Sequence, residues 1–391
     1  MLNNGKLLLG DDSALGSGVL TVAGASTLAT VTPLELNNSI EIKADLKVVA
    51  DHRLALNEKI TGVGKIIKSG SETLSLNTDN HYSGGTVLNK GTVRLSNAKA
   101  LGSGGLMVTG SATLDTVPHL ALDTPIELKA DLDITGRYLT LNSIISGSGG
   151  IIKSSSAPLK LNAANSYNGG TTLYDGQLLL GHPMALGQGV LTIKGAATLD
   201  NQLELALNNR IELQDDLNVM GVENLTLNAV ISGTKGLTKY GQAALTLNAA
   251  NTYQGDTTLY DGTLVLGKGA RLAATNRVNM IGAKAKWDIS AAGDQRIGAL
   301  TGVIGSGVDL GKNSLTFGND KQQTFAGVIS GQGGITKVGK GKAILSGTNT
   351  FTGNTTIHEG ALQIGDGGTG GSLIGDIINN SLLIFNHVDN R

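Results

Sequence analysis

Ser13 is the first candidate for chemistry, because a serine beside carboxylates has the residue types of nucleophilic catalysis. It closes the string Gly10-Asp-Asp-Ser13. A serine becomes a nucleophile when a histidine base and an orienting carboxylate serve it, and no His and Asp of this chain can be assigned to that role. The internal repeat also places Lys99 and Met184 opposite Ser13. We therefore expect a turn residue here, and no catalytic residue.

Metal chemistry has little support either. The histidines are scattered without the spacing of metal ligands, at His52, His81, His119, His182, His358 and His387. The segment Gly365-Asp-Gly-Gly-Thr-Gly-Gly371 is similar to a calcium-binding nonapeptide, but it occurs once and such sites need stacked copies. We expect a flexible glycine turn there, no metal site and no cofactor.

One aromatic position recurs and could form a sugar-stacking stripe. It is occupied in turn by Tyr82, Tyr167, Tyr253 and Phe351. Successive members would lie about four coils apart, roughly 19 Å in a stacked-strand architecture. That distance is long for one ligand, so packing in the core or at a corner is the favoured interpretation.

An acidic position recurs in the same way, at Glu41, Glu127 and Glu212, with a second carboxylate shortly after it at Asp45, Asp131 and Asp216. Enzymes that cleave polysaccharides use pairs of carboxylates that lie close together. Here the recurrence is once per repeat, so a solvated face is favoured over a catalytic cluster.

The elements that must position these residues are short strands and tight turns. Of 391 residues, 57 are Gly and 5 are Pro, while aromatics make up 3% and charged residues 16%. The chain is too apolar and too weakly charged to be disordered. It has 30 basic and 31 acidic residues without a run of like charge, which argues against nucleic-acid binding. Without cysteine it has no disulfide framework.

Two blocks recur with matching offsets. The block Ile60-Thr-Gly-Val-Gly-Lys-Ile-Ile-Lys68 returns at positions 145, 231 and 329, at steps of 85, 86 and 98. The block Asn80-His-Tyr-Ser-Gly-Gly-Thr86 returns at 165, 251 and 349, at the same steps. The chain therefore holds about four repeats, near 5–90, 91–175, 176–261 and 262–340, with 341–391 as further C-terminal coils.

A shorter period lies inside each repeat. The motif Leu-x-Leu-Asn recurs at steps of 20 within a repeat. It ends at Asn37, Asn57 and Asn77 in the first repeat, at Asn142 and Asn162 in the second, and at Asn208, Asn228 and Asn248 in the third. Apolar residues two apart, between Gly-rich turns, predict strands with one buried face. We therefore predict an all-β fold, a right-handed parallel β-helix of about 19 coils of roughly 20 residues, with about four coils per repeat. Its leucines would stack into a dry core and its asparagines into an amide ladder.

The residues Phe325–Ile357, followed by Gly360-Ala-Leu-Gln-Ile364, resemble the passenger-associated transport repeat of type V autotransporters, in the AIDA-like adhesin group. The order of Trp287-Asp-Ile-Ser290 and Leu315-Thr-Phe-Gly318 before it is similar too, and the likeness is strongest over 280–386. It implies secretion to the bacterial cell surface, a signal peptide before Met1 and an outer-membrane β-barrel beyond Arg391, near which 341–391 would lie. Proteases of this family carry a Gly-Asp-Ser-Gly nucleophile, which Gly10–Ser13 does not reproduce.

The repeat is a scaffold for several activities, so three hypotheses follow. The leading one is a non-enzymatic adhesin or self-aggregation factor in biofilms and virulence, whose polar ladders bind another copy, host matrix or glycans through many weak hydrogen bonds. The second is a polysaccharide-active enzyme. The third is an inert stalk that presents an N-terminal effector domain. The sequence does not identify binding residues.

Overall fold

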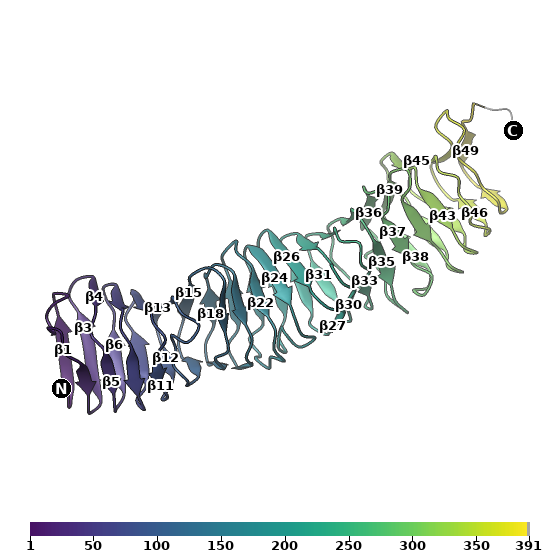
Figure 1. Cartoon of the computed structure of the whole chain (residues 1–391). Helices are drawn as coiled ribbons and strands as arrows, with labels where there is room; N and C mark the ends of the chain where they lie inside the picture. Colours follow the sequence, from purple (N-terminus) through teal and green to yellow (C-terminus); the bar gives the residue numbers. More distant parts are fainter. Residues whose placement is uncertain (389–391) are drawn as a thin grey trace. The chain divides into compact units, whose positions relative to one another are not determined.

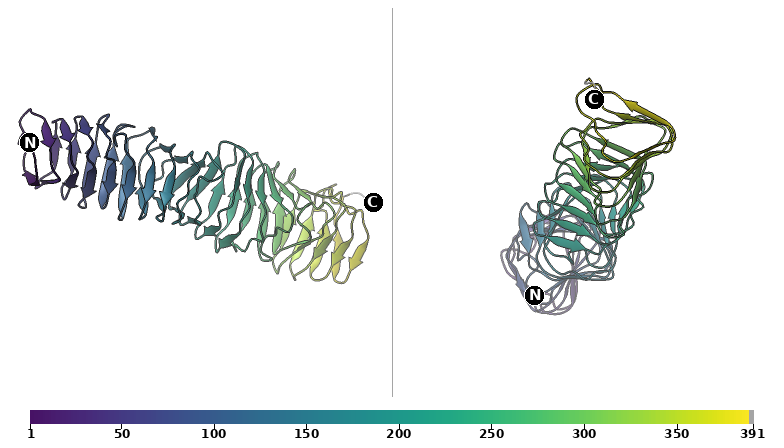
Figure 2. Two further views of the ribbon diagram at one scale, coloured as in Figure 1. Left: turned by 90° about the horizontal axis from the view of Figure 1, so that it is seen from below. Right: turned by 90° about the vertical axis from the view of Figure 1, so that its right-hand side faces the viewer.

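The computed structural model describes residues 1–388, which form 49 strands. They belong to two compact units, an N-terminal unit, Met1–Leu191, and a C-terminal unit, Thr192–Arg391. In each unit the strands lie side by side in parallel sheets (Figures 1 and 2). No helix within residues 1–388 is long and apolar enough to cross a membrane.

Alternation of side chains builds the core. In strands β7 (Leu54–Leu56) and β10 (Thr73–Leu76), Leu74 pairs with Leu54 and Leu76 with Leu56, one coil of 20 residues apart. These leucines are buried, so each coil places its apolar pair over that of the coil before it. The predicted parallel β-solenoid with coils of about 20 residues and about 19 turns is confirmed. Its right-handed sense stays a prediction.

The N-terminal unit contains four series of paired strands. A four-stranded sheet is formed by β2 (Leu20–Val22), β5 (Ile40–Ile42), β8 (Ile60–Gly62) and β11 (His81–Tyr82). An eight-stranded sheet is formed by β1 (Gly5–Leu9), β3 (Ser26–Thr30), β6 (Leu46–Val49), β9 (Ile66–Ser69), β12 (Thr86–Leu88), β14 (Leu106–Val108), β17 (Ile126–Leu128) and β20 (Ile145–Gly147). The third series is β4 (Leu34–Leu36), β7, β10, β13 (Gly91–Leu95), β15 (Ala112–Thr116), β18 (Leu132–Ile134), β21 (Ile151–Lys153) and β23 (Thr171–Leu173). The fourth is β16 (Leu120–Leu122), β19 (Leu139–Leu141), β22 (Leu159–Leu161) and β24 (Gly176–Leu180).

The C-terminal unit continues the same pattern. Its first series is β25 (Leu191–Ile193), β28 (Ile211–Leu213) and β31 (Ile231–Gly233). Its second is β26 (Ala197–Asn201), β29 (Leu217–Val219), β32 (Leu237–Lys239), β34 (Thr257–Leu259), β36 (Arg277–Met280), β39 (Ala299–Gly302), β42 (Gln323–Phe325), β45 (Lys342–Leu345), β47 (Ala361–Ile364) and β49 (Leu382–Phe385). A seven-stranded sheet is formed by β27 (Leu205–Leu207), β30 (Leu225–Leu227), β33 (Leu245–Leu247), β35 (Thr263–Leu266), β37 (Lys286–Asp288), β40 (Gly307–Asp309) and β43 (Val328–Ser330). A five-stranded sheet is formed by β38 (Gln295–Ile297), β41 (Leu315–Phe317), β44 (Ile335–Lys337), β46 (Thr355–Ile357) and β48 (Ile377–Asn379).

Equivalent strands of successive repeats lie on different sheets, because a repeat is slightly longer than four coils. Lys68 lies on β9, in the eight-stranded sheet. Its equivalent Lys153 lies on β21, in the series that begins with β4. A step of 85 residues exceeds four coils of roughly 20 residues by about 5, which is enough for one more short strand with its turn. The steps of 85 and 86 residues therefore advance the pattern by one strand, whereas the last step, of 98 residues, advances it by two, from Lys239 on β32 past β43 to Lys337 on β44.

A close approach of the backbone explains the glycine in the Ile-x-Gly block. Gly62 has φ of 114°, and a Cβ there would lie 2.1 Å from the carbonyl oxygen of Ile42 in the previous coil. Only glycine accepts both the conformation and the contact. The proposed division at 340/341 stays a prediction, and 389–391 of the C-terminal coils lie outside the described residues.

Candidate functional site

A buried lysine occupies one position in each repeat; the four are called here the buried lysines, Lys68, Lys153, Lys239 and Lys337. On β9, Lys68 points inward like Ile66 two residues before it. Its Nζ donates to the carbonyl oxygens of Ser69 at 3.1 Å, Gly70 at 2.8 Å and Lys90 at 2.9 Å. Lys90 belongs to the following coil, so one ammonium group joins the corners of two coils.

The other buried lysines repeat this arrangement. Each donates to carbonyl groups of its own corner and to one in the next coil, at Asp175, Asp261 and Glu359. Burial lowers the pKa of Lys68, Lys153 and Lys239 from 10.5 to about 8, and lowers that of Lys337. Neighbouring carboxylates oppose this shift, as Asp51 and Glu72 do at Lys68. Inside the coils these amines act as donors for backbone carbonyls.

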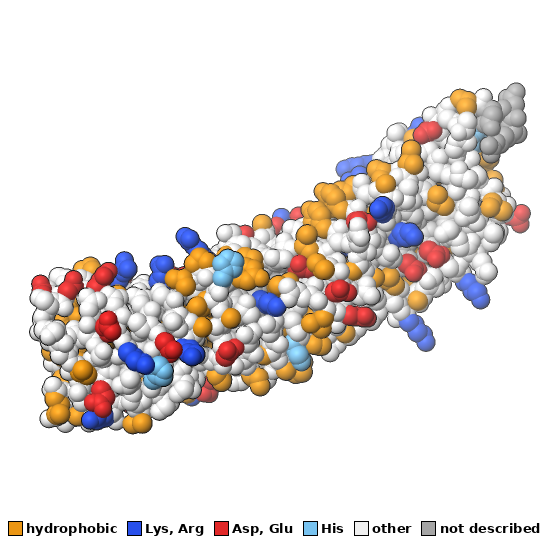
Figure 3. All heavy atoms as spheres, in the orientation of Figure 1, with side chains coloured by type: hydrophobic (Ala, Val, Ile, Leu, Met, Phe, Trp, Pro, Cys, Tyr) orange, Lys and Arg blue, Asp and Glu red, His pale blue; other side chains and the backbone are white. Residues whose placement is uncertain are grey.

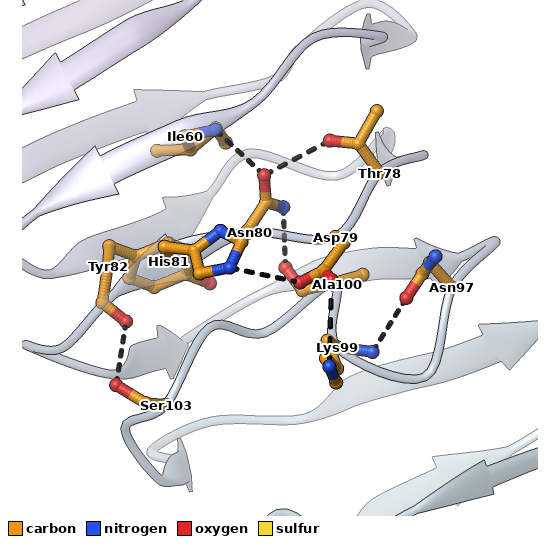
Figure 4. A network of polar contacts seen from close by, with 10 residues as sticks. All are labelled: Ile60, Thr78, Asp79, Asn80, His81, Tyr82, Asn97, Lys99, Ala100 and Ser103. Carbon is orange, nitrogen blue, oxygen red and sulfur yellow. Dashed lines mark hydrogen bonds and ion pairs between the residues drawn. The ribbon is translucent and has the colours of Figure 1, made fainter.

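A buried asparagine joins its coil to the previous one in each repeat, and in the first repeat it bridges three coils (Figure 4). Asn80 Oδ1 accepts from the backbone N–H of Ile60 at 2.8 Å, and its Nδ2 donates to the carbonyl oxygen of Ala100 at 2.7 Å. The two partners lie in the coils before and after Asn80. The same acceptor contact is made by Asn165, Asn251 and Asn349. This bridge satisfies backbone groups at corners, where strand pairing does not reach.

The recurring aromatic position is in the core, as predicted. Tyr82, Tyr167 and Tyr253 are fully buried, and each hydroxyl is 2.6 Å from the Oγ1 of the threonine four residues on, at Thr86, Thr171 and Thr257. Burial raises the pKa of all three phenols. Phe351 is equally buried but has no hydroxyl, and the Oγ1 of Thr355 is buried without a partner. Since all four rings are buried, they form no sugar-stacking stripe on the surface.

The predicted asparagine ladder is confirmed. Asn57 Nδ2 donates to Asn37 Oδ1 at 2.9 Å, and Asn77 Nδ2 donates to Asn57 Oδ1 at 2.7 Å. The same bonds, each of 2.8 Å, join Asn142 to Asn162, Asn208 to Asn228 and Asn228 to Asn248. The ladder is largely exposed, so its amides present a regular polar line to solvent.

Ser13 lies in a turn, as expected. Its backbone N–H donates to Asp11 Oδ1 at 2.8 Å, and its hydroxyl donates to the same oxygen. These hydrogen bonds lower the pKa of the Asp11 carboxyl. A hydroxyl held by its own turn, with a carboxylate instead of an imidazole as its partner, is not arranged as an activated nucleophile.

The acidic positions serve two purposes. Glu41 and Glu127 are partly exposed and pair with Lys43 at 3.3 Å and Lys129 at 3.6 Å, while Glu212 accepts from Gln214. They lie on β5, β17 and β28, so Glu41 and Glu127 belong to different sheets. The aspartates lie at the surface, and each also accepts a backbone N–H of the next coil, at Lys65, Gly150 and Gly236. Asp45, Asp131 and Asp216 are corner caps.

The histidines are placed apart by the fold. No group of three or more His, Cys, Asp or Glu within residues 1–388 is arranged to hold a metal ion. The segment Gly365–Gly371 forms a turn with φ of 83°, 95° and 95° at Gly365, Gly367 and Gly371. This conformation accounts for the glycines at these three positions.

A surface hollow in the N-terminal unit was not predicted from the sequence. It has a volume of about 470 Å³ and is lined on one side by Asp79, His81 and Lys99 (Figure 4). His81 Nε2 lies 3.8 Å from Asp79 Oδ1, and Lys99 Nζ lies 3.7 Å from Asp79 Oδ2. A second hollow of about 350 Å³ shares Pro125 with the first. Such groups can hydrogen-bond a polar ligand, but they contain no nucleophile served by a base.

The residues of this hollow can be recognised in the sequence because they differ from the equivalent residues of the later repeats. His81 stands where the later repeats have Ser166, Thr252 and Thr350, and Lys99 stands where a later repeat has Met184. The group of Asp79, His81 and Lys99 therefore occurs only in the first repeat. A search for residues that recur in every repeat does not find it.

The repeated polar set coincides with a known family. The passenger-associated-transport-repeat model matches residues 66–95, 151–180, 237–266 and 335–364. Each match contains one buried lysine, one bridging asparagine and one core aromatic residue. The chain carries four passenger-associated transport repeats. The resemblance described from the sequence is confirmed, and the fold is that of an autotransporter passenger-like β-solenoid.

The passenger-like chain also has a curated relative. It is 32% identical over 131 residues to the adhesin BmaC autotransporter of Brucella suis biovar 1 (strain 1330). The aligned part is 32% of this chain and 4% of that protein, so the chain spans a small part of its relative. No solved structure matches the chain.

Proposed function

We propose that this passenger-like β-solenoid is an adhesive element of the bacterial cell surface, anchored or released, that binds copies of itself, host matrix or glycans. The observation that carries the proposal is the coil-by-coil repetition of polar groups on the surface, of which the Asn37, Asn57 and Asn77 ladder is one case. Each hydrogen bond to a partner contributes only about 1 kcal/mol, but repeated contacts add up along the stack. The name of the adhesin relative supports the same class of function.

A non-catalytic role is part of this proposal. A carboxylate-dependent polysaccharide enzyme needs two carboxyl groups within about 5–10 Å of each other on one substrate. The recurring acids Glu41 and Glu127 lie on different sheets, and the recurring aspartates cap corners. This arrangement favours a scaffold over an enzyme, in biofilm formation or host contact.

Clumping of bacteria that display the full-length passenger tests the proposal, compared with a version that lacks residues 1–260. The two must be present on the surface in equal amounts, measured with an antibody against 262–340. We expect clumping, or attachment to matrix-coated wells, to be lost with the deletion. Unchanged clumping and attachment would show that this segment is a stalk and that the activity lies elsewhere.

A further inference from the structure

One face of the C-terminal unit carries three outward columns over strands β29, β32, β34, β36 and β39, called here the three-column face. Alternation along each strand sends every second side chain outward, and the parallel register aligns them from coil to coil. The middle column is Asn218, Thr238, Thr258, Asn279 and Thr301. The column before it is Asp216, Gly236, Asp256, Arg277 and Ala299, of which Gly236 and Ala299 are buried. The column after it is Met220, Tyr240, Tyr260, Ile281 and Val303.

The last column is apolar and reaches solvent. Met220, Tyr260, Ile281 and Val303 are 40%, 43%, 37% and 42% exposed. Val222 and Ile304, next to its two ends, are 69% and 80% exposed. Hydrophobic side chains gather over the region between β26 and β39 (Figure 3). Contiguous exposed apolar side chains on a soluble protein mark an interaction surface more often than scattered ones do.

The exposed area suits a protein partner. At about 80 Å² or more for each side chain, the column with its two neighbours presents on the order of 600 Å². A stable protein complex buries roughly 800 Å² on each partner, which the uncharged middle column can complete. A sugar would need a free ring face, but Tyr240 and Tyr260 stack on each other with ring centroids 4.4 Å apart. Each ring therefore covers one face of the other.

We propose that the three-column face binds the same face of a second copy of this chain in antiparallel orientation. The inference rests on the proposed function, since it names the surface through which the coils self-associate. The columns repeat at the strand spacing of about 4.8 Å, and a second copy has the same period over its whole length. A partner with another period would lose the match after one or two coils.

The order of the columns selects the antiparallel orientation. When two identical faces meet with their strand stacks running the same way, the left column of one meets the right column of the other. The apolar column would then lie on the column of Asp216 and Asp256. When one copy is turned end over end, each column meets itself, so that apolar side chains meet apolar ones and Thr and Asn meet Thr and Asn. Such a contact is isologous and closes after two copies.

The charges set the register. Arg277 Nη1 lies 3.8 Å from Asp256 Oδ2 on the neighbouring strand. If the two-fold axis passes between β34 and β36, Asp256 of each copy faces Arg277 of the other, and Tyr260 faces Ile281. An axis through β34 itself would place Asp256 against Asp256, which like-charge repulsion disfavours.

Sedimentation velocity of the purified 391-residue chain over a concentration series tests the face. We expect a reversible dimer whose dissociation constant rises at least about tenfold in Tyr260→Lys, because a charge enters the apolar column. The matched control is Tyr174→Lys, in the same Thr-Thr-Leu-Tyr-Asp-Gly string, where the preceding residues of its column are Thr135 and Ser154. The control is expected to leave the dimer unchanged.

Cross-linking tests the orientation, since the chain has no cysteine of its own. With a short bismaleimide, Thr258→Cys is expected to link to its own copy, because the two sulfurs lie about one coil apart along the stack. Asn218→Cys would lie about five coils, roughly 24 Å, from its copy and is expected not to link. Linking of both variants would overturn the antiparallel orientation.

The failures of the inference and of the proposed function are distinguishable. A dimer that withstands Tyr260→Lys overturns this face while leaving self-association in place. A chain that stays monomeric at every concentration also overturns the inference. Loss of clumping and matrix attachment on deletion of residues 1–260 is measured separately on cells, and it decides the proposed function.

Discussion

Replacing Lys68 by Met tests the contribution of the buried lysines. The substitution keeps a long unbranched side chain but removes the donor to three carbonyl oxygens, 3.1, 2.8 and 2.9 Å from Nζ. Each carbonyl that loses its donor costs about 1–2 kcal/mol, so the three together cost about 3–6 kcal/mol. The change also relieves the burial of a charge, so we expect a net loss of about 3 kcal/mol in local stability at pH 7.

Hydrogen exchange measured by mass spectrometry is the suitable assay, because a solenoid opens locally instead of unfolding at once. A loss of about 3 kcal/mol corresponds to roughly 100-fold faster exchange in the coils that contain Lys68 and Lys90. The control is Lys65→Met, which changes an exposed lysine of the same coil. Unchanged exchange in Lys68→Met, or an equal effect in the control, would refute the structural role of the buried amine.

Three further predictions concern the polar groups of the repeats. Phe351→Tyr supplies the hydroxyl partner that the buried Thr355 Oγ1 lacks, so the free energy of unfolding should rise by about 1 kcal/mol. The readout is a higher denaturant midpoint, and a lower midpoint would contradict the shared geometry of the four repeats. Asn165→Leu removes the bridge between coils and should lower the free energy of unfolding by about 2–4 kcal/mol. Asn162→Leu, in the asparagine ladder at the surface, should lower it by about 1 kcal/mol or less. Equal losses for the two variants in urea unfolding would refute the distinction. Burial lowers the pKa of Lys68, Lys153 and Lys239 to about 8, so above that pH the unfolded chain binds more protons than the folded chain. The free energy of unfolding should therefore rise from pH 8 toward 10.5. A decrease over this range, measured by chemical denaturation, would contradict the lowered pKa values.

The coil length could be predicted from the sequence because one spacing controls it. Apolar residues two apart in Leu74-Ser-Leu76, repeated every 20 residues, leave few folds in which every Leu is buried. The asparagine ladder follows from the same period. The core position of Tyr82 was predicted from the distance between repeats, and its burial confirms it.

Other features could not be predicted, because they depend on the few residues by which a repeat exceeds four coils and on the direction in which a side chain points. An excess of about 5 residues over four coils moves the second and third repeats on by one strand, and such a small excess does not stand out in a period of about 20 residues. Lys68 points inward like Ile66, but a lysine in a core is unusual, and one of its three carbonyl partners, Lys90, comes from the next coil. The three-column face depends on which residues pair between neighbouring strands. The number of residues from one coil to the next varies along it, as in the step of 21 from Thr258 to Asn279.

Competition with the purified chain tests the central claim, that these coils are themselves adhesive, most directly. The soluble 391-residue chain would be added to bacteria that display the full-length passenger, with a chemically denatured and desalted sample as the control. The account predicts that the folded chain reduces clumping or matrix attachment in a dose-dependent manner. Clumping and attachment that are unchanged at saturating amounts of folded chain would contradict it and identify the solenoid as a stalk.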